Sequence, residues 1–217
     1  MNRSLSQIIK RSSLFHCLLP ILLLWSPVFA KLGDVKMEGV WGGYKEPTAQ
    51  GMLKYVTAAF LPYNPVAIEI GGGHGEYTKL LAAQFPFGQV FVFESDREVF
   101  DQLASNIESL NNISAIPSDF YEEWCENNGI AAIDYLRFDA KFSGLGILKS
   151  HSASTKNISV VSVKLDFSSP KMNKRFLQKI RYRLELFGFK FLVQWIMEGV
   201  EGEMLFIRKD IYDSIFN

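Results

Sequence analysis

The chain has 217 residues, with 23 lysine and arginine residues against 23 aspartate and glutamate residues, so its formal net charge is zero. A chain without excess positive charge has no bulk electrostatic field that attracts nucleic acid, and we expect no nucleic-acid partner. An apolar fraction of 48% and an aromatic fraction of 14% exclude a disordered chain and predict one globular domain with a short extension.

The first thirty residues, 1–30, have the parts of a secretory signal peptide or signal anchor. Three basic residues and no acid precede an apolar run over 14–30, in which Val28 and Ala30 suit the −3 and −1 positions of a cleavage site. The run is shorter than the ~20 residues of a spanning helix. We therefore expect a protein that is exported or membrane-anchored by this signal. If the leader is not used, the domain stays cytoplasmic.

Strands and helices alternate along the rest of the chain. Residues 31–63 are expected to form an N-terminal cap with a helix over 47–60, and residues 64–217 form the main domain. Apolar runs predict strands at 66–70, 90–93, 113–117, 132–138, 158–167, 190–197 and 203–208. Periodic patterns predict helices at 76–84, 97–110, 144–152 and 171–187. The alternation predicts an α/β fold with a doubly wound, mostly parallel sheet, and the closing hairpin adds an antiparallel C-terminal strand.

The stretch from Val66 to Thr78 places an apolar strand, a glycine turn and a helix start in the order of a nucleotide-binding corner. Its glycines are Gly71, Gly73 and Gly75, with Gly72 between the first two. The third glycine of a G-x-G-x-x-G fingerprint would fall on Glu76 if counted from Gly71 and on Thr78 if counted from Gly73. Neither register fits, which disfavours NAD and FAD as cofactors. Acid-x-Gly-x-Gly-x-Gly is instead the pattern of class I S-adenosylmethionine (SAM) methyltransferases. It predicts their Rossmann-like fold, with SAM as the cofactor.

Three acidic residues follow neighbouring strands of the predicted sheet. Glu69 closes the first strand, where it can anchor the glycine loop or reach the amino-acid end of SAM through water. Glu94 ends the second strand and can accept hydrogen bonds from the ribose hydroxyls, with Ser95 beside it. Asp119 and Phe120 follow the third strand and suit the adenine amino group and ring. The alternative is that the glycines form an ordinary tight turn and the acids are solvated strand ends. No cysteine–histidine cluster has metal-ligand spacing, so no metal site is expected.

Four stretches of the chain resemble the FkbM-type methyltransferases. They are Ile68-Glu-Ile-Gly with Gly75-Glu-Tyr-Thr78, Val92-Phe-Glu-Ser-Asp96, Leu103-Ala-Ser-Asn-Ile107 and Ile133-Asp-Tyr-Leu-Arg-Phe-Asp139. The likeness covers roughly residues 64–167. It implies SAM held by the glycine loop, Glu94 and the Asp119 region, and methylation of a hydroxyl oxygen on a sugar or related metabolite.

The fourth strand departs from that family beyond Asp139. The family continues with two glutamates and a glycine between them, where this chain has Lys141 and Gly144 in place of the glutamates and Phe142 in place of the glycine. Asp139 remains the best-placed general base for a hydroxyl acceptor. Its alternative roles are a structural carboxylate or a ligand of the cofactor's amino group.

The helix expected over 171–187 has Phe176, Ile180, Leu184 and Phe187 on one face. Its basic residues are Lys171, Lys174, Arg175, Lys179, Arg181 and Arg183. We favour a solvated outer face whose other side packs on the sheet. Peripheral contact with an anionic membrane is the alternative.

Two functions are compatible with the sequence. The first is a SAM-dependent, FkbM-like O-methyltransferase that acts on a small-molecule or glycan-like acceptor. The second is an exported, catalytically degenerate protein of the same fold that serves as a binding or interaction module. The replaced residues after Asp139 and the leader motivate the second function, because an extracytoplasmic space offers little SAM.

Overall fold

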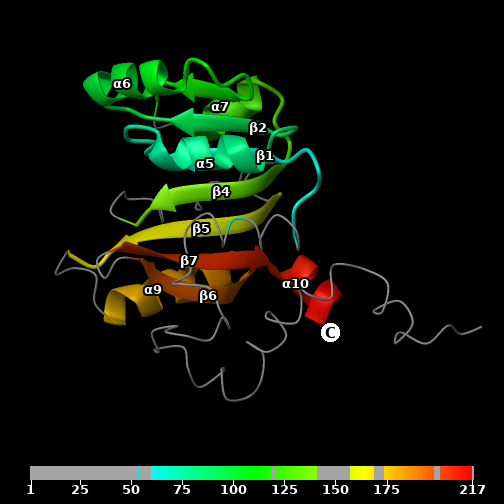
Figure 1. Cartoon of the computed structure of the whole chain (residues 1–217). Coiled ribbons are helices and arrows are strands. Elements are labelled where there is room, and N and C mark those ends of the chain that lie inside the picture. The colour runs from blue at the N-terminus through cyan, green and yellow to red at the C-terminus, as the bar shows by residue number, and fades with distance from the viewer. Residues whose placement is uncertain are drawn as a thin grey trace, which may run out of the picture.

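The computed structural model describes residue 53 and residues 60–118, 121–140, 157–168, 174–197 and 201–216. These residues form alternating strands and helices around one sheet (Figure 1). In chain order the elements are β1 (Val66–Ile70), α5 (Glu76–Gln84), β2 (Gln89–Phe93), α6 (Arg97–Ile107), β3 (Ile113–Ile116), α7 (Tyr121–Asn127), β4 (Ile133–Asp139), β5 (Ile158–Asp166), α9 (Lys174–Leu186), β6 (Phe189–Met197), β7 (Glu201–Arg208) and α10 (Lys209–Phe216).

The sheet has seven strands in the order β3-β2-β1-β4-β5-β7-β6. Strands β1 to β5 pair in parallel, and β7 pairs antiparallel with both β5 and β6. The predicted doubly wound, mostly parallel sheet with an antiparallel C-terminal strand is therefore confirmed. Because β1, β2 and β4 are parallel neighbours, their carboxyl ends meet at one edge of the sheet, which is where open α/β sheets bind ligands.

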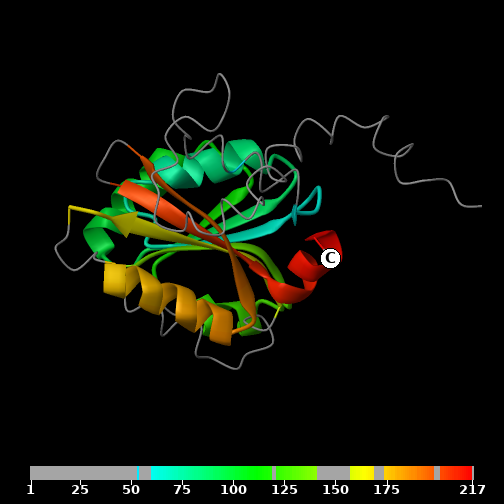
Figure 2. The same ribbon diagram turned by 90° about the horizontal axis from the view of Figure 1, so that it is seen from below.

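Helices cover both faces of the sheet (Figure 2). On one face, Leu81 of α5 and Phe85, the residue after that helix, pack against β1, β4 and β7. On the other face, Cys125 of α7 and Ile180 and Leu184 of α9 pack in a larger apolar cluster. The central strands contribute nearly continuous buried runs, as expected for strands covered on both sides.

Most predicted elements lie within a few residues of their observed bounds. Helix α6 begins after Asp96, whose side chain accepts hydrogen bonds from the Glu98 and Val99 amides as an N-cap. Two short helices, α7 and α10, are not among the predicted elements. The leader at 1–30, most of the predicted cap at 31–63 and the helix predicted over 144–152 lie outside the described residues.

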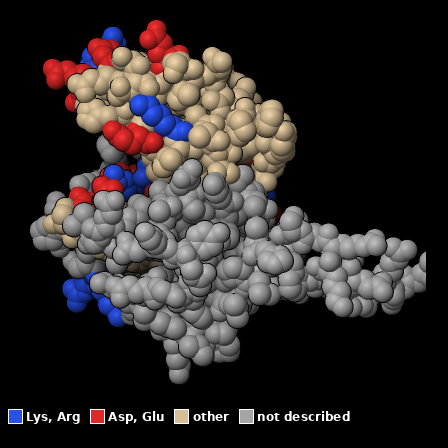
Figure 3. Space-filling model, in the orientation of Figure 1, with Lys and Arg blue, Asp and Glu red and all other residues tan. Residues whose placement is uncertain are grey.

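Helix α9 packs one face on the sheet, as the apolar spacing predicts for Ile180 and Leu184. Phe187 instead is 41% exposed, because the helix ends at Leu186 and the chain turns at Gly188, whose φ is +87°. Figure 3 shows basic side chains at the lower left, where Figure 1 places α9, and mixed acids and bases over α6 at the upper left. No helix in the described part of the chain is both long and apolar enough to cross a bilayer.

Candidate active site

The turn between β1 and α5 takes its shape from glycines with positive φ. The φ angles of Gly71, Gly73 and Gly75 are 77°, 56° and 90°. Residues that have a Cβ rarely adopt this region of backbone conformation. The amides of Gly71 and Gly72 both donate to the Phe93 carbonyl, at 2.8 and 3.2 Å. The loop is thereby fastened to the end of β2, the strand that Glu94 directly follows.

The glycines of this loop have different structural roles. A Cβ on Gly72 would lie 2.2 Å from Cγ2 of Val92 and 3.2 Å from Cδ2 of Leu103, so Gly72 is required by packing. A Cβ on Gly73 would meet no heavy atom within 4 Å. Gly73 therefore presents the open surface of the loop, to which a ligand can come close.

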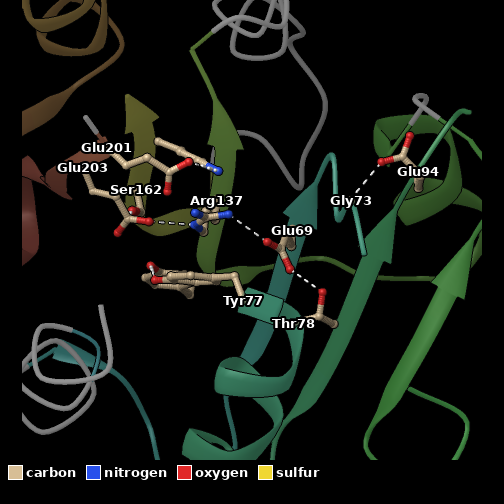
Figure 4. Close-up of polar contacts among 11 residues, drawn as sticks. Glu69, Gly73, Tyr77, Thr78, Glu94, Arg137, Ser162, Glu201 and Glu203 are labelled. Carbon is tan, nitrogen blue, oxygen red and sulfur yellow. Dashed lines mark hydrogen bonds and ion pairs between the residues drawn. The ribbon is translucent and has the colours of Figure 1, made fainter. Parts of the chain in front are cut away.

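Glu94 turns its carboxylate toward the glycine loop (Figure 4). Its Oε2 accepts from the Gly73 amide at 3.1 Å and its Oε1 accepts from the Asp96 amide at 3.0 Å. The residue as a whole is 7% exposed. Each carboxylate oxygen has two lone pairs, so one acceptor site per oxygen remains for a further donor. The structure thus brings together two predicted features, the strand-end acid and the loop.

The other predicted site residues lie in different surroundings. Ser95 is exposed beside Glu94. Asp139 is the last residue of β4, half-buried, and is in register with Lys164 of β5. Asp119 and Phe120 lie outside the described residues.

Glu69 belongs to a buried ionic cluster inside the domain. Its Oε1 accepts from Nη1 of Arg137 at 2.8 Å, and its Oε2 accepts from the Thr78 hydroxyl at 2.7 Å. The Nε of Arg137 donates to Oε1 of Glu203 at 2.8 Å, and the Ser162 hydroxyl donates to the other oxygen of Glu203 at 3.1 Å. Figure 4 shows the guanidinium between the two carboxylates. The cluster joins β1, β4, β5, β7 and the first turn of α5.

Burial and charge act against each other in this cluster. Burial raises the pKa of the Glu69 carboxyl, and the Arg137 guanidinium opposes that effect. Burial by itself would lower the pKa of Arg137, but the carboxylates of Glu203 and Glu69 outweigh it and raise that pKa. Arg137 therefore stays charged. Burial also raises the pKa of the neighbouring phenols of Tyr77 and Tyr135, whose oxygens lie 2.8 Å apart, so both stay protonated.

The sequence predictions did not include Arg137 and Glu203. A usable signal was present for Arg137, which stands between the apolar residues Leu136 and Phe138, where a buried charge requires a partner. Glu203 gave no such signal, because its strand begins and ends with other charged residues. The signal indicates that a partner exists but does not say which residue it is. Among the described residues, no group of three histidine, cysteine or acidic side chains gathers as metal ligands would.

No protein-family model and no curated protein sequence matches the chain. Similar solved structures are SAM-dependent methyltransferases. The fibrillarin of Aeropyrum pernix, in complex with natively bound S-adenosyl-L-methionine, has a TM-score of 0.54 and 13% identity over 73% of each chain. A SAM-dependent methyltransferase from Aquifex aeolicus has a TM-score of 0.51 and 11% identity, over 76% of this chain and 99% of that one.

The precorrin-6y C5,15-methyltransferase of Geobacter metallireducens has a TM-score of 0.55 and 14% identity, over 76% of this chain and 92% of that one. At such identities the likeness establishes the fold alone. This chain has the Rossmann-like fold of the class I SAM-dependent methyltransferases.

Proposed function

We propose that this chain is a SAM-dependent methyltransferase of the FkbM type, which methylates a hydroxyl oxygen of a small-molecule or glycan-like acceptor. The observation that carries the proposal is the contact between Glu94 and the glycine loop, with Oε2 of the carboxylate 3.1 Å from the Gly73 amide nitrogen. This contact lies at the edge of the sheet where ligands bind in this fold class. The methyltransferase fold and the four FkbM-like stretches support the assignment.

The residues present fit SAM. A ribose offers two adjacent hydroxyl donors, and Glu94 has one remaining acceptor site on each of its two oxygens. Gly73 leaves open space where a side chain would stand. Glu94 would therefore hold the ribose, and the loop would face the rest of the cofactor.

SAM supplies a methyl group on a sulfonium, which the acceptor oxygen takes by in-line displacement. The new bond joins the acceptor oxygen to the methyl carbon, the carbon–sulfur bond breaks, and its electron pair stays on sulfur as a neutral thioether. The acceptor's proton needs a base, and Asp139 at the end of β4 is the residue we assign to receive it. Much of the rate would come from holding donor and acceptor in line.

Calorimetry of SAM binding tests the cofactor assignment. The wild-type protein should bind SAM, and Glu94→Gln, which loses one of the two acceptor oxygens, should weaken the affinity by about tenfold or more. Glu98→Gln is the matched control, because Glu98 is exposed in the first turn of α6. The affinity of this variant for SAM should stay within about twofold of the wild-type value. A wild-type protein that does not bind SAM at millimolar concentration refutes the proposal.

Turnover separates an enzyme from a binding module of the same fold. SAM is incubated with the protein and a cell extract as the source of acceptors, and formation of the demethylated product is followed. Asp139→Asn should lower turnover while SAM affinity stays within about twofold, because the asparagine keeps the shape of the side chain without its basicity. SAM binding with no turnover on any acceptor fraction would favour the catalytically degenerate alternative.

A further inference from the structure

The ionic cluster of Glu69, Arg137 and Glu203 contains more negative than positive groups. Two carboxylates share one guanidinium, so with both of them ionised the formal charge of the three side chains is one positive minus two negative, or −1. Because burial raises the pKa of Glu69, the cluster carries this charge fully only at pH values above that pKa. Their side chains are 1%, 6% and 0% exposed in chain order. Water therefore screens this charge poorly.

Within the described part of the chain, the other hydrogen-bond partners of the cluster are neutral. They are the Thr78 hydroxyl on Glu69 and the Ser162 hydroxyl on Glu203. The nearest lysine in the register, Lys164, is engaged elsewhere, with its Nζ 3.1 Å from Oε1 of Glu201. Among the described residues, one negative charge of the cluster thus remains without a second buried cation beside it.

This charge lies close to the glycine loop. Glu69 precedes Gly71 by two residues on β1 and holds Thr78 in the first turn of α5. Glu69 therefore lies on the strand that leads into the loop and contacts the helix that follows the loop (Figure 4). A charge in that place acts through the protein interior on whatever the loop binds.

The two forms of the cofactor differ in charge. SAM carries a fixed positive charge on sulfur, and its demethylated product is a neutral thioether of nearly the same shape. A site that binds only by shape separates them poorly, and product that stays bound blocks the next turnover. We propose that the excess negative charge of the Glu69–Arg137–Glu203 cluster makes the site prefer the cationic methyl donor over the neutral product.

This inference rests on the proposed function and names a selectivity determinant of the same site. The three residues act through space on the cofactor. Their expected effect follows from Coulomb's law, because a unit charge roughly 10 Å from a cation, at an effective dielectric constant of about 20, changes its binding by about tenfold. The neutral product should feel almost none of this field.

The test compares Glu203→Gln with Glu201→Gln at pH 8. The two glutamates are two residues apart on β7, and the substitutions remove the same charge, but Glu203 is buried and the Glu201 side chain is 48% exposed. Glutamine at 203 keeps an amide oxygen that can accept from Arg137 and leaves the cluster neutral. Affinities for SAM and for its demethylated product are measured by calorimetry, together with the melting temperature of each variant.

We expect Glu203→Gln to lower the ratio of SAM affinity to product affinity by about three- to tenfold. Glu201→Gln should change the ratio by less than about twofold, because its charge is screened. An unchanged ratio in folded Glu203→Gln overturns the inference. So does an equal loss of both affinities, which would reveal a purely structural role.

Glu69→Gln neutralises the cluster from its other end and should lower the ratio in the same way, which keeps the test decisive if Glu203→Gln does not fold. Failure of the proposed function gives a different result. In that case the wild-type protein binds neither SAM nor its product, whatever the state of the cluster.

Discussion

The guanidinium carbon of Arg137 lies 3.6 Å from the ring centroid of Tyr77, so the cation stacks on the first turn of α5. The next residue of that turn, Thr78, donates to Glu69. The helix that follows the glycine loop is therefore attached to the sheet by two consecutive polar contacts, in addition to its apolar packing. Arg137 and Glu69, which make these contacts, also belong to the buried cluster whose excess negative charge is proposed to select the methyl donor.

Removing Arg137 should strongly destabilise the fold. Arg137→Met keeps much of the side-chain volume but leaves two buried carboxylates without their cation, and we expect a loss of about 3–5 kcal/mol in the free energy of unfolding, measured with urea. Lys164→Met is the control, because its ion pair with Glu201 is partly exposed and should contribute less than about 1 kcal/mol.

The triple variant Arg137→Met, Glu69→Gln, Glu203→Gln should regain a large part of the stability lost in Arg137→Met, since no buried charge is left unpaired. If Arg137→Met lowers the free energy of unfolding no more than Lys164→Met does, the ion pairs of the buried cluster stabilise the fold no more than a partly exposed pair.

Glu69 should give the stability of the protein a distinct dependence on pH. Burial raises its pKa above the ordinary glutamate value of 4.5, despite Arg137 and Thr78. Between pH 4.5 and the raised pKa, the Glu69 carboxyl of the folded protein holds a proton that the same group in the unfolded chain has released. The contribution of Glu69 to stability is therefore complete below 4.5, and it falls as pH rises through this window by up to about 1.4 kcal/mol per pH unit.

The measurement is the unfolding free energy of the wild type minus that of Glu69→Gln, taken at several pH values. Other titrating groups cancel in this difference. It should decrease as pH rises through the window and be flat above it. A difference that increases with pH would mean that ion pairing with Arg137 outweighs burial and that the pKa of Glu69 is lowered.

Gly72→Ala should destabilise the protein through one contact. The new Cβ would lie 2.2 Å from Cγ2 of Val92, a fully buried side chain with little freedom to move. Overpacking of this kind costs about 1–3 kcal/mol. In a double-mutant cycle with Val92→Ala, the two losses should be clearly non-additive, because the second change removes the atom that clashes. Additive losses would locate the strain of Gly72→Ala elsewhere.

Cys125 should be unreactive in the folded protein. Its thiol is fully buried, and burial, with help from Glu122 and Glu126, raises its pKa to about 11. At pH 8 only about one thiol in a thousand is then a thiolate. In a Cys17→Ser variant, a colorimetric thiol reagent should label nothing until denaturant is added, and then one thiol per chain. Fast labelling of the native variant would contradict this environment.

Local patterns along the chain predicted most of the fold. The strand at Val66–Ile70, the glycine turn and the helix at Glu76–Gln84 are consecutive, so their apolar periods and turn chemistry can be read from neighbouring residues. Helix α7 was not predicted, because its seven residues bury only Tyr121 and Cys125, too few to show a helical period. The roles of Asp119 and Phe120 beside the cofactor stay predictions.

The sequence by itself determined the alternation of strands and helices, the glycine loop and the strand-end acid Glu94. Only the tertiary structure decided that β7 lies between β5 and β6, and that Arg137 joins Glu69 to Glu203. The physical reason is separation along the chain. Arg137 is 68 residues from Glu69 and 66 residues from Glu203 along the chain. No local pattern specifies which distant charges meet once the sheet has formed.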